Sequence, residues 1–198
     1  MNLLVDRLAF MNTTQPIREQ LVSHAIDQIM GHGYNGFSYR DLSQLVGVKT
    51  SSIHYYFPTK DDLVLEAVHE YSGKVLGIVQ SIDESLPADQ KLALYTKYFG
   101  MSLGEGDRIC LCGMLAADIG SLPDNIRQAV QAFFKSHERW LSKVLAQGAR
   151  EGSLIANGEP EHAARALFAA YQGSVLASRL FQTRSRLEEI ETAWKIAK

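Results

Sequence analysis

Residues 33–63, GYNGFSYRDLSQLVGVKTSSIHYYFPTKDDL, decide the fold of this chain. Ser38 and Asp41 have the spacing of a capping box, in which side chains satisfy the backbone N–H groups that a helix start leaves free, so a helix is expected to begin here. Three apolar residues follow at helical spacing: Leu42, Leu45 and Val46. Gly47 comes next, and glycine can adopt the left-handed conformation that ends a helix. The pattern therefore predicts a short helix that stops at a sharp turn.

A second short helix is predicted after this turn. Thr50 or Ser51 is expected to cap its start, and Ile53 and Phe57 are expected to point inward. The remaining residues of this helix all carry hydrogen-bonding groups: Thr50, Ser51, Ser52, His54, Tyr55 and Tyr56. Residues 59–62 have the pattern T-x-x-D, a further capping box that begins a third helix. The segment is thus predicted to be a helix-turn-helix.

Basic residues bracket the two short helices. Arg40 lies on the first, Lys49 precedes the second and Lys60 follows it, whereas Asp41 is the one acid between positions 33 and 60. A helix-turn-helix lays its second helix in the major groove of DNA, and flanking groups bind phosphates. Lys60 falls in a first helical turn, where free N–H groups also attract phosphate. The predicted DNA contacts are Ser38, Tyr39, Arg40, Lys49, Thr50, Ser51, Ser52, His54, Tyr55, Tyr56 and Lys60.

The segment resembles the signature of TetR-family transcriptional repressors. The resemblance is carried by SYRDL, LVGV and HYYFPTKDDL, and it is dense from Ile17 to Val68. Over the remainder it covers only the overall helical organisation. The family often has Ser where Lys49 stands and Tyr where His54 stands, so the operator preference does not carry over and the second helix could start one residue later.

The resemblance implies a homodimer that binds a palindromic double-stranded DNA operator and is released by a small-molecule inducer. Two chains would place their second helices in successive major grooves, roughly 34–36 Å apart. Inducer would favour a conformer in which the helix at 59–82 is tilted, so DNA is released through the differential affinity of the ligand for the two conformers. Activation of transcription in place of repression stays open.

The remaining sequence predicts an all-α chain of about nine helices. Residues 1–15 are expected to be a flexible arm in which Met11 is an alternative start, and residues 16–62 the DNA-binding domain. Residues 63–198 are expected to form the effector-binding and dimerisation domain, joined to the first by the helix at 59–82. Further helices are predicted at 89–103, 110–119, 124–152 and 160–181, with one more at the C-terminus.

Composition limits the partners and the location. The 198 residues can bury a sizeable core, and the net charge of −2 excludes polyanion binding through bulk charge while it leaves local contacts open. Two cysteines form no disulfide framework, which favours a reducing cytoplasm. The start, MNLLVDRLAF, is interrupted by Asp6 and Arg7, and no segment is long enough to cross a membrane.

The second domain is expected to hold the inducer, as the resemblance implies. Aromatic, sulfur and histidine side chains would line a mainly apolar site with a few polar anchors. His137 is a polar group on an apolar helix face, and a buried imidazole needs a partner. Core packing is the competing interpretation for these residues. The candidates are Phe99, Cys112, Met114, Phe133, His137, Trp140, Phe168 and Tyr171.

Cys110 and Cys112 offer an alternative, a redox- or electrophile-sensing repressor. A reactive thiol needs a nearby cation or helix start to lower its pKa, which Arg108 could supply. Inert buried thiols are the simpler interpretation, and metal binding with His137 or His162 is a third.

No enzyme or cofactor is predicted from the motifs. The sequence has no G-x-S-x-G, H-E-x-x-H or P-loop, and the formal G-x-G-x-x-G at 31–36 lacks the preceding strand of a dinucleotide site. A helical enzyme or ligand carrier with a structural helix-turn-helix is the remote alternative.

The C-terminal helices are predicted to pair two chains. Small residues allow helices to approach closely, and a two-fold dimer uses the same surface on both subunits. The predicted interface residues are Ala163, Leu167, Ala170, Ser174, Leu187, Ile190 and Trp194.

Overall fold

The computed structural model describes residues 16–101, 108–155, 158–183 and 185–196. These residues form nine α-helices and two 3-10 helices without a β-strand, which confirms the all-α prediction. An isolated bridge pairs Leu154 with Lys195. The predicted arm at residues 1–15 lies outside the described residues.

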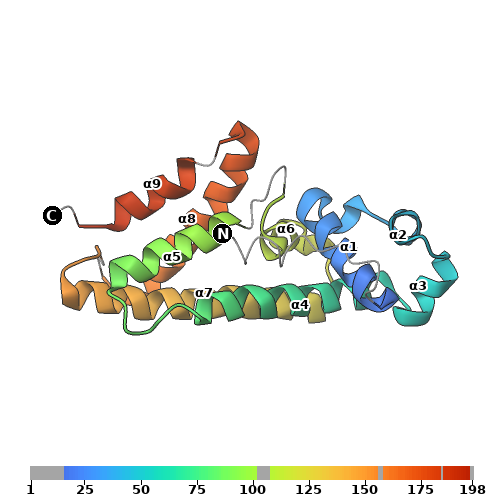
Figure 1. Ribbon diagram of the computed structural model, residues 1–198, viewed down its shortest axis with the longest axis horizontal. Helices are drawn as coiled ribbons and strands as arrows, with labels where there is room; N and C mark the ends of the chain where they lie inside the picture. The colour runs from blue at the N-terminus through green and yellow to red at the C-terminus, as the bar shows by residue number, and fades with distance from the viewer. Residues whose placement is uncertain (1–15, 102–107, 156–157, 184, 197–198) are drawn as a thin grey trace.

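The first helices form a head at one end of an elongated molecule, and the later helices form a body at the other (Figure 1). The head contains α1 (Ile17–His32), the 3-10 helix η1 (Tyr34–Gly36), α2 (Tyr39–Val46) and α3 (Thr50–Tyr56). The body contains α5 (Ala88–Met101), α6 (Leu111–Ala117), η2 (Ile119–Ser121), α7 (Asp124–Glu151), α8 (Pro160–Phe181) and α9 (Ser185–Trp194). The long helix α4 (Lys60–Gln80) runs from the head into the body.

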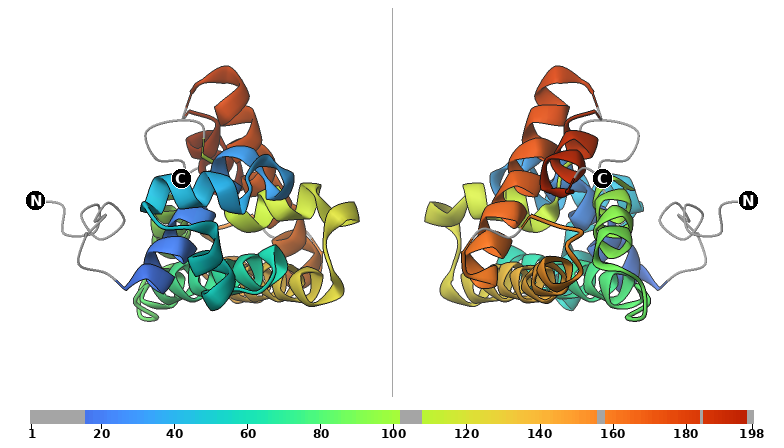
Figure 2. Two further views of the ribbon diagram at one scale, coloured as in Figure 1. Left: turned by 90° about the vertical axis from the view of Figure 1, so that its right-hand side faces the viewer. Right: turned by 90° about the vertical axis from the view of Figure 1, so that its left-hand side faces the viewer.

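Two long helices form the base of the molecule. α4 packs against α1 in the head and against α7 in the body, so it contacts both parts of the chain. α8 packs on α7 and α9 packs on α8. In the end views, α8 and α9 rise above the layer of α4 and α7 (Figure 2). The division into residues 16–62 and 63–198 stays a prediction.

Helix starts and stops follow local chemistry. Both capping boxes are present, at Ser38 with Asp41 and at Thr59 with Asp62. Gly47 ends α2 with φ 75° and ψ 29°, the left-handed conformation that glycine adopts without a Cβ clash.

One predicted helix start is wrong. Thr50 and Ser51 do not cap α3, because Lys49 occupies the N-cap position without a side-chain hydrogen bond. The Lys49 carbonyl accepts hydrogen bonds from Ser52 N at 2.9 Å and Ile53 N at 3.4 Å, so the helix begins one residue earlier than a Thr50 cap requires. The hydroxyl of Thr50 is therefore not used as a cap.

Candidate nucleic-acid interface

The turn between α2 and α3 is fixed by backbone hydrogen bonds. Gly47 N and Val48 N donate to the Ser43 carbonyl at 3.0 and 3.1 Å, which closes the end of α2. On the other side of the turn, Ile53 is fully buried and Phe57 is 3% exposed, so α3 is anchored by its inner face. Its opposite face is left to solvent.

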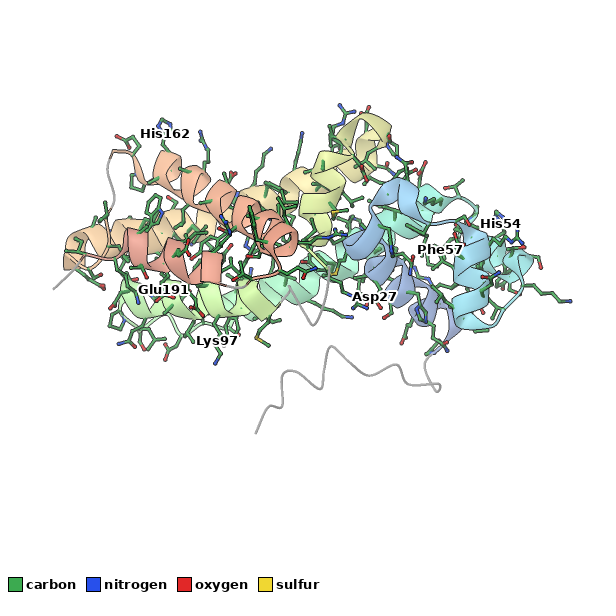
Figure 3. The ribbon with its side chains drawn as sticks, turned by 90° about the horizontal axis from the view of Figure 1, so that it is seen from above. Asp27, His54, Phe57, Lys97, His162 and Glu191 are labelled. Carbon is green, nitrogen blue, oxygen red and sulfur yellow. The ribbon has the colours of Figure 1, made fainter. Side chains whose placement is uncertain are left out.

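The exposed face carries most of the predicted DNA contacts. Tyr55 has 82% of its surface exposed, which makes it the most open of the large apolar or aromatic side chains among the described residues. We call the exposed set the reading face. Its members are Ser38, Arg40, Lys49, Thr50, Ser51, His54, Tyr55 and Tyr56. Ser52 is half-buried beside them. His54 and Phe57 lie at the far end of the head, remote from His162 and Glu191 in the body (Figure 3).

Tyr39 and His54 are held by contacts within the head. Tyr39 Oη lies 2.9 Å from the Phe57 carbonyl and 2.5 Å from the Thr59 carbonyl. The rings of Tyr39 and His54 meet edge to face at 4.8 Å, and His54 Nδ1 donates to the Pro58 carbonyl at 3.1 Å. Burial, with the nearby Asp62 and Asp61 carboxylates, raises the pKa of Tyr39, so the hydroxyl remains a donor. Tyr39 therefore positions α3 against the start of α4.

Lys60 differs from its predicted role. Its Nζ donates to the Tyr34 carbonyl at 2.5 Å and to the Phe37 carbonyl at 2.6 Å. The ammonium also lies over the Tyr34 and Phe37 rings, 4.7 and 4.2 Å from their centroids. Burial lowers the pKa of Lys60, an effect opposed by the Asp61, Asp41 and Asp118 carboxylates. The charge is already bound to backbone carbonyls, which argues against the predicted phosphate contact.

An aromatic cluster joins three helices of the body. Tyr95 of α5 stacks on Trp140 of α7 at 5.2 Å and meets Tyr171 of α8 at 5.1 Å. His137 stacks on Phe168 at 5.0 Å. Six predicted effector residues belong to this cluster: Phe99, Phe133, His137, Trp140, Phe168 and Tyr171. Sequence reasoning missed Tyr95 as a member, although it lies four residues before Phe99 on the same helix face.

His137 is a half-satisfied polar group inside this cluster. It is fully buried, and its Nδ1 lies 2.8 Å from Tyr95 Oη. Its Nε2 has no hydrogen-bond partner among the described residues. Burial lowers the pKa of His137 to about 4, so the ring is neutral at neutral pH.

In the described part of the chain, Met114 and Cys112 of α6 have no ring contact with the aromatic cluster, and they contact the head and α4. The end of the Met114 side chain lies against Gly33 of the head, and Cys112 Sγ lies 3.9 Å from Ser72 Oγ of α4. Their membership of one effector site with the aromatic cluster stays a prediction. Their positions depend on how α6 packs against α1 and α4, which helical spacing does not show.

The cysteines have the surroundings of inert thiols. Cys110 and Cys112 are 1% and 0% exposed, and burial raises the pKa of Cys112 well above its ordinary value. Arg108, the expected activating cation, pairs with Asp27 of α1 at 2.8 Å. In the part of the chain that the structure describes, no three metal-binding side chains come together.

The predicted dimer residues are mostly covered by their own chain. Leu167, Leu187, Ala163 and Ile190 are buried within their own chain, with at most 9% exposure. Ala170, Ser174 and Trp194 are half-buried. The face of α8 that is open carries Leu176, Leu180 and Phe181, with exposures of 54%, 76% and 59%. An interface requires surface that the single chain leaves uncovered, so this face is the better candidate, and the predicted interface stays untested.

The fold and the reading face define a helix-turn-helix DNA-binding regulator. Residues 21–67 match the family described as bacterial regulatory proteins, tetR family, and residues 92–194 match the tetracyclin repressor-like C-terminal domain. The chain belongs to the TetR family of transcriptional regulators, a class of proteins that are not enzymes. This finding confirms the resemblance, the head-and-body fold and the function of a DNA-binding regulator.

Known relatives match over most of the chain. The transcriptional regulator AcuR of Cereibacter sphaeroides is 24% identical over 82% of this chain and 76% of its own. The HTH-type transcriptional repressor DhaR of Mycobacterium sp. strain GP1 is 24% identical over 89% of both chains. A TetR-family regulator from Agrobacterium tumefaciens is 27% identical, covers 91% of this chain and 98% of its own, and superposes with a TM-score of 0.84. None of the helices within the described ranges is long and apolar enough to span a bilayer.

Proposed function

We propose that this regulator is a dimeric repressor that binds a pseudo-palindromic operator through its reading face and leaves it when a small molecule binds the body. The observation that carries the proposal is the outward face of α3. Ile53 and Phe57 anchor the helix, yet its other side presents hydroxyl, imidazole and phenol groups to solvent. A polar outer face is usual for a surface helix, but the 82% exposure of the Tyr55 ring is not, and it marks this face as a contact surface.

Within the reading face, the charged residues and the uncharged hydrogen-bonding residues have different expected roles. Arg40 and Lys49 are exposed and have no salt bridge among the described residues, so they are available to phosphates. Thr50 and Ser51 occupy the first turn of α3, the part of such a helix that meets base edges. Arg40 and Lys49 would thus supply affinity, while Thr50 and Ser51 would supply sequence preference.

The open face of α8 supports a two-fold dimer. Leu176, Leu180 and Phe181 form an uncovered apolar surface on the helix that also packs against α7 and α9. A second copy of the chain presents the same surface, so an antiparallel or crossed pair of α8 helices would bury both at once. Two reading faces joined in this way would bind two half-sites of one operator.

The aromatic cluster supports an inducer site in the body. His137 Nε2 lacks a partner in a fully buried position, and a ligand that hydrogen-bonds there would satisfy it. The cluster also links α5, α7 and α8. A ligand inserted among these helices would move α5 and α7, which pack on α4, and α8, which carries the open apolar face. Repression as the default effect is supported by the likeness to DhaR. The predicted cytoplasmic location stays a prediction.

Selection of bound sequences from a random DNA library tests the proposal. The purified protein should recover a palindrome at physiological salt, and a variant with Arg40→Ala and Lys49→Ala should recover much less DNA. A variant with Glu161→Ala and Arg165→Ala, both exposed on α8 away from the head, serves as the control. Recovery of no enriched sequence by the wild-type protein would contradict the proposal.

A further inference from the structure

Two body residues, Asp118 and Ser121, hold the junction between α1 and α2, residues 33–37. Tyr34 N donates to Asp118 Oδ2 at 2.7 Å, and Asp118 is the residue that joins α6 to η2. Nearby, Asn35 Nδ2 donates to Ser121 Oγ at 3.4 Å. The end of α6 is therefore attached to the head at a point separated from it by 84 residues of sequence.

The same residue, Tyr34, is held from the other side by the start of α4. Its carbonyl accepts from Lys60 Nζ at 2.5 Å, and its hydroxyl donates to the Asp61 carboxylate. Burial and Asp61 together raise the pKa of Tyr34 to about 12, so the phenol keeps its proton. Tyr34 thus connects the end of α6 with the first turn of α4 through three separate polar groups.

The approach of Asp118 to the junction depends on Gly33. A Cβ atom at position 33 would lie 2.7 Å from Asp118 Oδ2 and 3.3 Å from the Met114 side chain. The backbone at Gly33 also has φ 79°, in the range that favours glycine. The close approach of the Asp118 carboxylate therefore requires glycine at position 33.

Other body residues hold the last turns of α1. Ile109 N donates to the Met30 carbonyl at 3.2 Å, and Arg179 of α8 donates to the Gly31 carbonyl at 2.8 Å. These contacts place the end of α1 against the segment that precedes α6 and against α8, while α4 is the covalent link between head and body. The head is thus attached to the body through α4 and, separately, through hydrogen bonds at the end of α1 and at the junction.

We propose that Asp118 is a positioning residue for operator binding. Its carboxylate fixes the α1–α2 junction, and the junction in turn fixes Lys60 and the orientation of α2 and α3 relative to α4. The inference rests on the proposed function of the reading face, and it adds a second connection through which the body controls that face. Loosening this connection lowers operator affinity, because two half-sites are bound together only when both heads are held in a fixed orientation.

Asp118→Ala and Asp118→Asn separate positioning from simple folding. Alanine removes the acceptor for Tyr34 N–H, whereas asparagine keeps an oxygen in the same place. Hydrogen bonds to ionised groups change equilibria by roughly tenfold or more, so alanine should weaken binding to the selected operator about tenfold and asparagine less than about threefold. Asp124→Ala is the matched control, since Asp124 is 88% exposed and lies on the first turn of α7.

Three measurements decide the matter: the dissociation constant for the selected operator, the melting temperature, and hydrogen exchange at the Tyr34 amide. The proposal requires weaker binding and faster Tyr34 exchange in Asp118→Ala than in Asp124→Ala. A lower melting temperature with operator affinity equal to the control, or tighter binding, would overturn it. If Asp118→Ala does not fold by circular dichroism, Asp118→Ser replaces it, because the shorter side chain does not reach Tyr34 N.

The experiment distinguishes a wrong role for Asp118 from a wrong assignment of the reading face as the DNA-binding surface. Lys49→Ala is measured in the same series. If Lys49→Ala weakens operator binding while Asp118→Ala does not, Asp118 is a structural residue only. If the wild-type protein selects no operator, the reading face itself is wrong, and Tyr34 exchange alone then reports whether Asp118 holds the junction.

Discussion

Replacement of His137 by phenylalanine should remove much of the acid sensitivity of this protein. The imidazole is fully buried, and burial lowers its pKa to about 4, against 6.5 for the ordinary side chain. Because the folded pKa is the lower one, the unfolded chain takes up the proton first as the pH falls. The contribution of His137 to stability is therefore complete above pH 6.5 and is lost progressively down to about pH 4.

The size of the effect follows from the two pKa values. Within this window each pH unit costs about 1.4 kcal/mol, so the free energy of unfolding should fall by about 2 kcal/mol between pH 7 and pH 5. For a chain of this length such a loss lowers the melting temperature by roughly 4–8 °C. His137→Phe fits the stack between Phe133 and Phe168 but leaves Tyr95 Oη without its partner, which lowers stability equally at both pH values.

Chemical denaturation of three proteins at pH 7 and pH 5 measures the effect. Wild type and Tyr95→Phe should each lose about 2 kcal/mol, because burial and not the Tyr95 hydrogen bond shifts the histidine pKa. His137→Phe should lose much less over the same interval. Equal losses for His137→Phe and wild type would refute the reasoning and would assign the acid sensitivity to other groups.

Three further outcomes are expected. Lys49→Ala should lower the salt dependence of operator binding by about one phosphate contact. Lys60→Met should leave that dependence unchanged and lower the melting temperature, because the Lys60 ammonium binds two carbonyls inside the head. Leu180→Glu should shift sedimentation from dimer toward monomer, and an unchanged dimer would exclude the open face of α8 as the interface. Mild peroxide should leave operator affinity unaltered, because Cys110 and Cys112 are buried; a loss of affinity that Cys112→Ser abolishes would restore the sensing alternative.

Local chemistry made the head predictable from the sequence. The capping boxes at Ser38 and Thr59 and the stop at Gly47 depend on hydrogen bonds between residues three or four apart, so the pattern of residue types is sufficient. The start of α3 was missed because the Lys49 backbone carbonyl accepts the hydrogen bonds from Ser52 N and Ile53 N that a Thr50 hydroxyl was expected to accept.

Long-range packing was not predictable in the same way. The carbonyl partners of Lys60 are 26 and 23 residues away, and no local pattern indicates that a lysine at a helix start will turn inward. α8 has apolar residues on two faces, and periodicity alone cannot tell which one the chain covers for itself. The structure shows that Leu167 faces inward and Leu180 outward, which favours the Leu180 face over the predicted one as a contact surface.

The position of Arg179 has a consequence for genetics. This residue directly precedes Leu180, which lies on the open apolar face of α8. The Arg179 guanidinium binds the Gly31 carbonyl at the end of α1. A screen for alleles that lose repression should therefore recover substitutions near the end of α8 as readily as substitutions in α3. Such alleles would look like DNA-contact mutants by phenotype, although the altered residue lies on α8 and not on the reading face.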